Sequence, residues 1–361
     1  MSRGTPDPSS QPPPFRLAPA PAPKEVQKST VEHAPGTRFC YNTGASYMLA
    51  AIVQKVSGQT LLGYLTPRLL GPLGIEGATW DASPQGIAFG GFGLSVKTED
   101  MARFGQLYLQ KGRWQGRQIL PPAFVEAATA VQIATPGGGD WGAGYGYQFW
   151  RCTHNAYRAD GMFGQECIVI PDHDCVVVTT SATDRLGALF EGVWEHLLPA
   201  VGGRLGGDAA FRARLAALTL APGTAAAGPP GAPALSGQRH MLAPNEADLE
   251  AIELHVSADA CRVTLRQGGR ETGPLECGFG TWRSSQAIGP RAGAAPCSGW
   301  ASWEPDGTLR LDWYFVHAVH GVTLRIMSRA GGGVAVDFRP NVGGHAQGLT
   351  VHSIRSEPAD G

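Results

Sequence analysis

The chain has 361 residues, of which 43% are hydrophobic, and its 29 Lys and Arg residues nearly balance its 30 Asp and Glu residues. This length can bury one large core or two of ordinary size, and we expect two domains. The net charge is −1 and there is no run of basic residues, so the sequence lacks the usual signature of proteins that bind nucleic acids or acidic membranes. We therefore expect a small-molecule substrate as the partner, with no nucleic acid and no membrane.

The seven cysteines are scattered, without C-x-x-C or zinc spacing, which favours reduced, mostly buried thiols and predicts no metal site. The sequence shows no charged segment followed by an apolar run at its start and no stretch of about 18 apolar residues, which predicts a soluble, cytoplasmic chain as given. The glycines of residues 142–146 precede a predicted strand rather than a helix, so they do not indicate a dinucleotide site. We expect no cofactor.

Residues 1–30 are rich in proline and lack hydrophobic periodicity, so they are predicted to be a disordered leader. A helix is predicted to follow over residues 43–58. Its apolar positions recur at the helical period: Met48, Leu49, Ile52, Val53 and Val56. This pattern predicts a helix that is buried on that face, with Thr43 or Ser46 as its N-cap and Gly58 as its left-handed stop.

The region that follows is predicted to contain helices, then four strands, then a further helix. Helices are predicted over residues 60–70, from Thr98 to Leu109 and from Leu186 to Leu198, and a further short helix is predicted to start at Pro121-Pro122. Strands are predicted over residues 145–152, 156–162, 166–170 and 175–181. A hairpin turn at residues 171–174 joins the last two strands, so the sheet is predicted to be antiparallel.

Residues 202–234, which are rich in Ala, Pro and Gly from 221 onward, are predicted to be a linker. Beyond it, strands are predicted over residues 249–256, 261–267, 308–316 and 322–328. The apolar residues of the third strand alternate with polar neighbours: Leu309, Leu311, Trp313 and Phe315. Residues 235–355 are therefore predicted to form a separate β domain with one face in water.

A series of motifs between residues 31 and 201 resembles the serine β-lactamase-related hydrolases, which include class C β-lactamases, penicillin-binding proteins and β-lactamase-like esterases. In chain order they are Pro35-Gly36-Thr37-Arg38-Phe39, Tyr41-Asn42-Thr43, Gly91-Phe92-Gly93-Leu94-Ser95, Glu99-Asp100-Met101-Ala102-Arg103-Phe104 and Tyr157-Arg158-Ala159-Asp160-Gly161-Met162-Phe163-Gly164-Gln165. The resemblance implies an α+β fold with an antiparallel sheet flanked by helices, incomplete in residues 31–201. Residues 235–355, through segments such as Gly278-Phe279-Gly280-Thr281-Trp282, resemble a small lipocalin-like, barrel-like β domain.

Hydrolases of this family use an S-x-x-K nucleophile, a Y-x-N tyrosine, and a K-T-G or H-x-G strand. The resemblance implies that Tyr41 is the proton shuttle and that the backbone N–H of Met162 is an oxyanion donor. It implies that the following residues bind substrate: Asn42, Thr43, Asp160, Gly161 and Gln165. Thr43 stands where the pattern has Asn, and Asp160 stands where it has Lys or His. Asp160 can alternatively be interpreted as a solvated strand end.

The S-x-x-K element is absent from the sequence. The five lysines are preceded, three positions earlier, by Pro21, Glu25, Ile52, Leu94 and Tyr108, so none follows a serine at the required spacing. No nucleophile is assigned. A free tyrosine ionises near pH 10, so without a neighbouring cation only about one molecule in a thousand carries the phenolate at pH 7.

Three interpretations stay open. The chain can be a serine hydrolase for esters or amides that lacks its N-terminal third and is inactive alone, a non-catalytic ligand-binding pseudoenzyme, or a fragment completed by a separate N-terminal piece. An incomplete sheet would leave an edge strand open, which predicts possible self-association through that edge.

Overall fold

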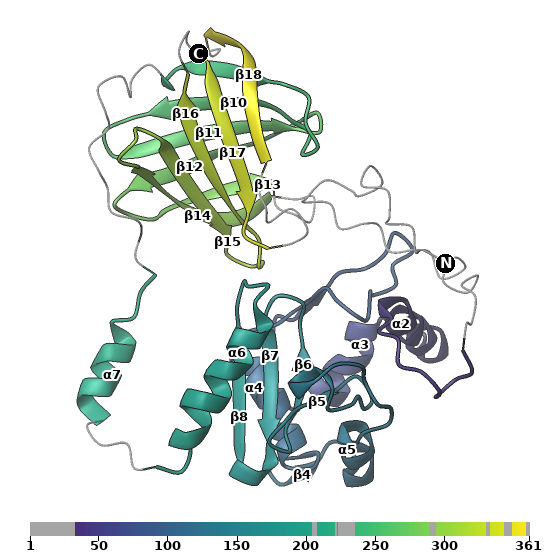
Figure 1. Cartoon of the computed structure of the whole chain (residues 1–361). Helices are drawn as coiled ribbons and strands as arrows, with labels where there is room; N and C mark the ends of the chain where they lie inside the picture. Colours follow the sequence, from purple (N-terminus) through teal and green to yellow (C-terminus); the bar gives the residue numbers. More distant parts are fainter. Residues whose placement is uncertain are drawn as a thin grey trace. The chain divides into compact units, whose positions relative to one another are not determined.

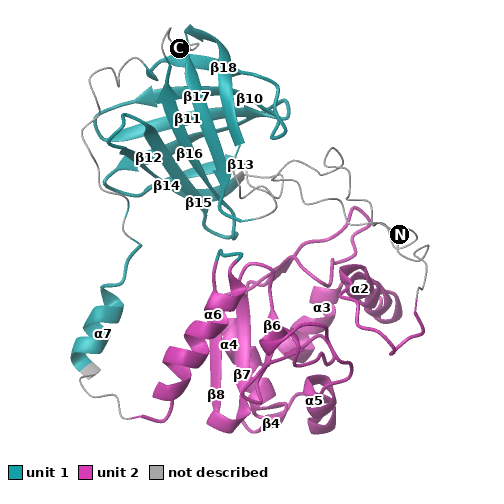
Figure 2. Cartoon of the chain, viewed as in Figure 1, with its two compact units in different colours: residues 1–18, 182–184, 205–361 teal, residues 19–181, 185–204 magenta. Residues whose placement is uncertain are grey.

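The computed structural model describes residues 33–203, 208–220, 222, 235–288, 294–329, 333–342 and 349–358. The chain divides into two compact units, shown in two colours in Figure 2. We call residues 19–181 and 185–204 the mixed unit, and residues 1–18, 182–184 and 205–361 the barrel unit. The predicted leader lies outside the described residues. So does most of the predicted linker, although its described part includes helix α7 (Asp208–Ala216).

The mixed unit contains a sheet of four described strands in the order β5-β6-β7-β8, all antiparallel. Its strands are β5 (Trp150–Arg151), β6 (Tyr157–Asp160), β7 (Gln165–Ile170) and β8 (Cys175–Thr180). The predicted antiparallel sheet and the β7–β8 hairpin are confirmed, and Asp174 closes the turn in the left-handed region (φ 46°). The strand predicted from residue 145 is shorter, because Gln148 has a positive φ of 66° that interrupts regular pairing.

Two short hairpins also belong to this unit: β1 (Thr79–Trp80) with β2 (Leu94–Ser95), and β3 (Arg113–Trp114) with β4 (Arg117–Gln118). Its helices are α2 (Thr43–Ser57), α3 (Leu61–Leu65), η2 (Thr66–Leu70), α4 (Thr98–Leu109), α5 (Pro122–Thr129), η3 (Gly139–Trp141), η4 (Pro171–His173), α6 (Leu186–Gly192), η5 (Val193–Leu197) and η6 (Leu198–Ala200). No helix in the described ranges is long and apolar enough to cross a membrane.

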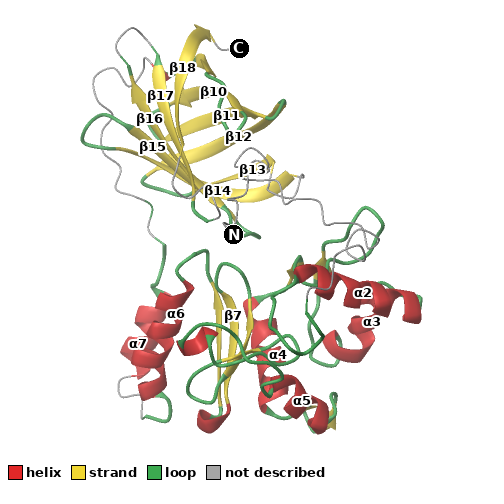
Figure 3. Cartoon of the chain, turned by 45° about the vertical axis from the view of Figure 1, so that its right-hand side comes forward, coloured by secondary structure: helices red, strands yellow, loops and turns green. Residues whose placement is uncertain are grey.

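Helices cover both faces of the four-stranded sheet (Figures 1 and 3). On one face, Ile168 and Ile170 of β7 pack with Phe190 of α6 in a buried apolar cluster. On the other face, Val169 of β7 packs with Tyr108 of α4. These layers confirm the predicted α+β architecture. Among the described strands, β5 and β8 are the edges of this sheet, and self-association through such an edge stays a prediction.

Helix α2 begins and ends close to the predicted positions, but its N-cap is different. The side chain of Asn42, not that of Thr43 or Ser46, caps the helix, since Asn42 Oδ1 accepts a hydrogen bond of 3.1 Å from the backbone N–H of Ala45. Gly58 ends the helix in the left-handed conformation (φ 67°), as predicted.

The prediction that the apolar stripe of α2 is buried is wrong. Leu49, Ile52 and Val56 are 53%, 52% and 82% exposed, whereas Tyr47 and Ala50 are buried. The helix packs through this other face against the Gly90-Gly91 turn, where a Cβ on Gly90 would lie 2.5 Å from the backbone oxygen of Ser46. The periodic pattern identified the helix correctly but not the side that the rest of the unit covers.

The barrel unit confirms the predicted barrel-like β domain. Its strands are β9 (Gln238–Leu242), β10 (Leu249–Val256), β11 (Ala260–Gln267), β12 (Arg270–Phe279), β13 (Arg283–Ile288), β14 (Ala294–Trp303), β15 (Leu309–Phe315), β16 (Gly321–Ser328), β17 (Val334–Pro340) and β18 (Leu349–Pro358). Nine of these described strands form a closed ring in the order β12-β11-β10-β9-β18-β17-β16-β15-β14, because β12 also pairs in parallel with β14. Strand β13 pairs with β14.

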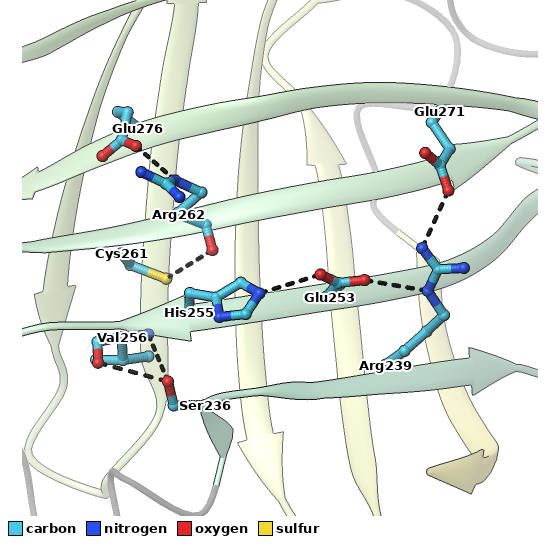
Figure 4. Close-up of polar contacts among 9 residues, drawn as sticks. All are labelled: Ser236, Arg239, Glu253, His255, Val256, Cys261, Arg262, Glu271 and Glu276. Carbon is cyan, nitrogen blue, oxygen red and sulfur yellow. Dashed lines mark hydrogen bonds and ion pairs between the residues drawn. The ribbon is translucent and has the colours of Figure 1, made fainter. Parts of the chain in front are cut away.

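The inner and outer faces of the barrel differ as the alternation predicted. The four alternating apolar residues of β15 are all buried in its core: Leu309, Leu311, Trp313 and Phe315. Outside, charged residues of strands β9 to β12 pair with one another (Figure 4). Arg239 contacts Glu253 at 3.1 Å and Glu271 at 3.0 Å, and Arg262 contacts Glu276 at 2.7 Å. Such partly exposed pairs on the barrel surface contribute little stability individually, so the barrel depends mainly on its apolar interior.

The close packing of α4 on the sheet gives a testable prediction. A Cβ added to Gly105 would lie 2.6 Å from Val176 Cγ1 and 2.7 Å from Cys167 Sγ. We expect Gly105→Ala to lower the free energy of unfolding of the mixed unit by about 1–3 kcal/mol, because overpacking forces these neighbours apart. Urea denaturation measures the change.

Gly192→Ala is the matched control. Gly192 also lies in a helix, but a Cβ there would meet no atom within 4 Å. We expect this variant to keep or raise the stability by up to about 1 kcal/mol, since alanine is the better helix former. Equal stability of the two variants would contradict the packing account.

Candidate functional site

Tyr41 lies directly before the N-cap of α2 and forms part of an aromatic cluster. Its side chain is 58% exposed. Its ring stacks on Trp150, with centroids 6.0 Å apart and planes 16° apart, and meets Tyr145 edge-on at 6.4 Å. Phe39 contacts the same two rings at 5.1 and 5.4 Å. We call Phe39, Tyr41, Tyr145 and Trp150 the aromatic wall.

A buried guanidinium lies on the inner side of this wall. Arg158 of β6 is fully buried, and its guanidinium carbon lies 5.5 Å from the ring centre of Trp150, 4.5 Å from that of Trp141 and 4.4 Å from that of Phe190. Its Nη1 donates a hydrogen bond of 3.1 Å to the backbone oxygen of Asp140. Contacts between a cation and aromatic faces compensate part of the cost of burying the charge.

Asp160, at the end of the same strand, provides the direct counter-charge. Arg158 Nε donates to Asp160 Oδ2 at 2.8 Å, because residues two apart on a strand share one face of the sheet. Glu166 lies directly opposite Asp160 on β7, and its Oε2 is 3.8 Å from Arg158 Nε. No role for Arg158 or Glu166 was predicted from the sequence. The alternation of residues 158 and 160 on one strand could have indicated that Arg158 and Asp160 share a face. The position of Glu166 opposite Asp160 could be known only from the register of β6 and β7.

Glu166 is the least satisfied polar group of this cluster. Its side chain is fully buried, and within the described residues neither of its carboxyl oxygens has a hydrogen-bond partner, nor does Arg158 Nη2. Burial raises the pKa of Glu166 to about 9, and the neighbouring Asp160 charge adds to this rise, while Arg158 opposes it. Glu166 is therefore protonated and neutral at pH 7, and Asp160 is left to pair with the guanidinium.

The charge of Asp160 also acts on the aromatic wall. Burial, followed by the Asp160 charge, raises the pKa of Tyr41. Burial raises the pKa of Tyr145 to about 12, with smaller contributions from Tyr41 and Asp160. The wall and the end of β6 thus lie within electrostatic range of each other. Both phenols stay protonated at neutral pH, so Tyr41 is a hydrogen-bond donor rather than a ready base.

The turn after β6 holds the other predicted residues. Gly161 N–H donates to the backbone oxygen of Gln165 at 2.9 Å, and Gln165 Nε2 donates to the backbone oxygen of Ser181 at 2.9 Å. The side chain of Met162 is 77% exposed, and no hydrogen-bond acceptor for its backbone N–H is found in the described part of the chain. This N–H is therefore available to a ligand, whereas the amide nitrogen of Gln165 already serves to hold the turn.

Asn42 and Thr43 lie at the entrance of α2 beside Tyr41. Asn42 is exposed but its Oδ1 is used as the helix cap. Thr43 is exposed, and its Cγ2 packs so near Gly91 that a Cβ there would lie 2.9 Å away. The substrate-binding roles of these residues, and those of Asp160, Gly161 and Gln165, stay predictions. In the described ranges, no group of three or more His, Cys, Asp or Glu residues could hold a metal ion.

Comparison with known proteins agrees with the motifs. The Beta-lactamase family model matches residues 2–200 of the chain. No curated protein matches. Solved structures similar to the chain include a "Putative 6-aminohexanoate-dimer hydrolase from Bacillus anthracis", which is 27% identical and has a TM-score of 0.43. The match covers 49% of this chain and 48% of that chain.

Two further structures are more distant in sequence. A β-lactamase from Mycobacterium bovis is 24% identical, with a TM-score of 0.38, and the match covers 46% of this chain and 67% of that chain. The octameric penicillin-binding protein homologue from Pyrococcus abyssi is 15% identical, with a TM-score of 0.35, and the match covers 93% of this chain and 71% of that chain. The chain thus spans about half the length of the Bacillus protein.

The buried Glu166 predicts an unusual pH dependence of stability. A raised pKa means that the folded state keeps a proton that the unfolded state loses between about pH 4.5 and pH 9. The stabilisation by the neutral carboxyl is complete below this window and is lost as pH rises through it, by at most about 1.4 kcal/mol per pH unit. We expect Glu166→Gln, which stays neutral, to remove this slope from the free energy of unfolding.

Urea denaturation at pH 5.5, 7 and 8.5 measures the slope for both proteins. Glu126→Gln is the control, because Glu126 is an exposed acid of α5 that pairs with Lys111 at the surface. We expect this control to keep the wild-type slope. A Glu166→Gln protein with an unchanged slope would show that Glu166 is ionised in the folded protein at neutral pH.

Proposed function

Since the chain belongs to the Beta-lactamase family, we propose that Tyr41, Asp160 and the backbone N–H of Met162 form a binding site for a small ester or amide. Hydrolysis of such substrates through an acyl-enzyme is the chemistry that the family motifs imply. We further propose that the 361 residues alone bind the substrate without turning it over, because they contain no S-x-x-K element. One observation carries the proposal: Trp150 contacts the exposed Tyr41 ring and also the Arg158 guanidinium that holds Asp160.

Each group has a distinct task in this proposal. The Met162 N–H donates a hydrogen bond to the substrate carbonyl oxygen, on which negative charge develops during acyl transfer. The Tyr41 hydroxyl, protonated at neutral pH, donates to the leaving group of the ester or amide. The aromatic wall contacts the apolar part of the substrate and excludes water from that side.

The raised pKa of Tyr41 supports this proposal of binding without turnover. A proton shuttle in acyl transfer must also accept a proton, and a raised pKa makes the phenolate still rarer than one in a thousand at pH 7. Binding followed by hydrolysis would use the same residues and differ only in turnover, so one pair of measurements separates it from binding alone.

Binding and turnover of short-chain esters test the proposal. We expect the wild-type protein to bind ethyl butyrate, measured by the change in tryptophan fluorescence, and not to hydrolyse p-nitrophenyl butyrate above the buffer rate. Tyr41→Phe keeps the ring but removes one hydrogen bond, so we expect binding to weaken by about two- to tenfold. Tyr64→Phe is the control, because the Tyr64 ring contacts Arg68 of η2.

Three results would contradict parts of this proposal. Absence of ester binding would contradict the site itself. Hydrolysis that Tyr41→Phe abolishes would show that the chain is catalytic after all. Hydrolysis that survives Tyr41→Phe would contradict the proton-shuttle role of Tyr41.

A further inference from the structure

Only one of the two carboxylate oxygens of Asp160 accepts a hydrogen bond from the described residues. Oδ2 accepts the hydrogen bond from Arg158 Nε, whereas Oδ1 has no donor among the described residues. The side chain is 9% exposed, so the carboxylate is mostly desolvated. A mostly desolvated acceptor that can still reach solvent gains more from a charged donor than an exposed carboxylate does.

The Arg158 guanidinium balances the charge of Asp160 through Oδ2 but places no donor on Oδ1. The guanidinium of Arg158 is fully buried and points its Nη1 away from Asp160, toward the backbone oxygen of Asp140 and the sulfur of Cys152. Glu166 is neutral at pH 7, as described above. Burial and, to a smaller extent, the Asp160 carboxylate raise the pKa of Tyr41.

The aromatic wall adds a second element that attracts cations. Aromatic faces bind ammonium and guanidinium groups, and the structure already holds Arg158 against Trp150 on the inner side of this wall. On the outer side, the Tyr41 ring is 58% exposed and stacks on Trp150. Trp150 thus contacts the Tyr41 ring and also the Arg158 guanidinium, which holds Asp160. A carboxylate oxygen and an exposed aromatic ring linked in this way are a combination suited to a positively charged amine.

We infer that this site takes esters or amides that carry a protonated amine, with the ammonium group bound by Asp160 Oδ1 and the ring of Tyr41. The inference rests on the proposed function of the same site and adds the charge of its substrate. Neutral analogues make the same contacts with Met162 and the aromatic wall but leave Asp160 Oδ1 unpaired. Anionic analogues place a second negative charge beside Asp160, which disfavours binding.

Three matched esters test the inference: ethyl 4-aminobutyrate, ethyl 4-acetamidobutyrate and monoethyl succinate. They present a cation, a neutral amide and an anion on similar chains, and their binding to the whole chain at pH 7.5 is measured by isothermal titration calorimetry. We expect the cation to bind about tenfold more tightly than the neutral ester, and the anion to bind most weakly. This comparison needs no variant, so it does not depend on the folding of a mutant.

Two variants then assign the effect to residues. Asp160→Asn keeps the shape of the side chain, and we expect it to reduce the tenfold preference to about one. Tyr41→Leu is expected to weaken binding of the cationic ester about threefold more than that of the neutral ester, because the aromatic face is lost. Asp174→Asn, in the exposed β7–β8 turn, is the charge-matched control and is expected to keep the preference.

The outcomes separate this inference from the proposed function. Equal binding of the cationic and neutral esters would overturn the inference and leave the proposed function standing. Absence of binding by all three esters would overturn both. A preference for the cation that persists in a folded Asp160→Asn protein would also overturn the inference, because the charge would then be recognised elsewhere.

Discussion

The hydrogen bond between Arg158 Nε and Asp160 Oδ2 joins the core of the mixed unit to its candidate site. Burying an isolated guanidinium costs several kcal/mol, so the surrounding residues are arranged to compensate it. The backbone oxygen of Asp140 accepts from the same guanidinium, and the carboxylate of Asp140 accepts from Thr153 and from Trp194. One buried charge therefore fixes the relative positions of η3, the turn after β5, the end of β6 and η5.

The same cluster determines which protons are present at the candidate site. The cluster contains one guanidinium, Arg158, and two buried carboxyl groups, Asp160 and Glu166. The guanidinium balances the negative charge of Asp160, and a second negative charge would be unfavourable, so Glu166 retains its proton. Burial and then the remaining carboxylate, Asp160, raise the pKa of Tyr41, whose phenol is protonated at neutral pH in any case. The site is consequently built from donors that are already protonated, with a single carboxylate beside them. Its chemistry follows from the charge balance of the core beneath it.

Local patterns in the sequence were sufficient for much of the fold. The alternation of Leu309, Leu311 and Trp313 predicted a strand and its buried face correctly, and the sheet of the mixed unit was predicted as antiparallel. Strands β12 and β14 were not predicted, because glycine and proline interrupt their alternation. Gly299 shows why: a Cβ there would lie 2.7 Å from Cys277 Sγ, so the close pairing that closes the barrel excludes a regular strand residue.

The site could be predicted only as far as motifs reached. Tyr41, Asp160 and Met162 followed from the resemblance, whereas Glu166 depends on its register opposite Asp160, which no local pattern specifies. The prediction that the apolar stripe of α2 is buried was wrong for a related reason. A helical period defines an apolar face but does not identify what covers that face.

The pairing of β9 with β18 brings the first and last described strands of the barrel side by side. A module whose ends are neighbours can be joined to another protein, or inserted into one, without distortion of its interior. The same adjacency would allow circular permutation, in which a short peptide joins the old ends and new termini open in an exposed hairpin such as that between β10 and β11. The closed ring of strands thus has the properties of a domain that can be transferred between proteins.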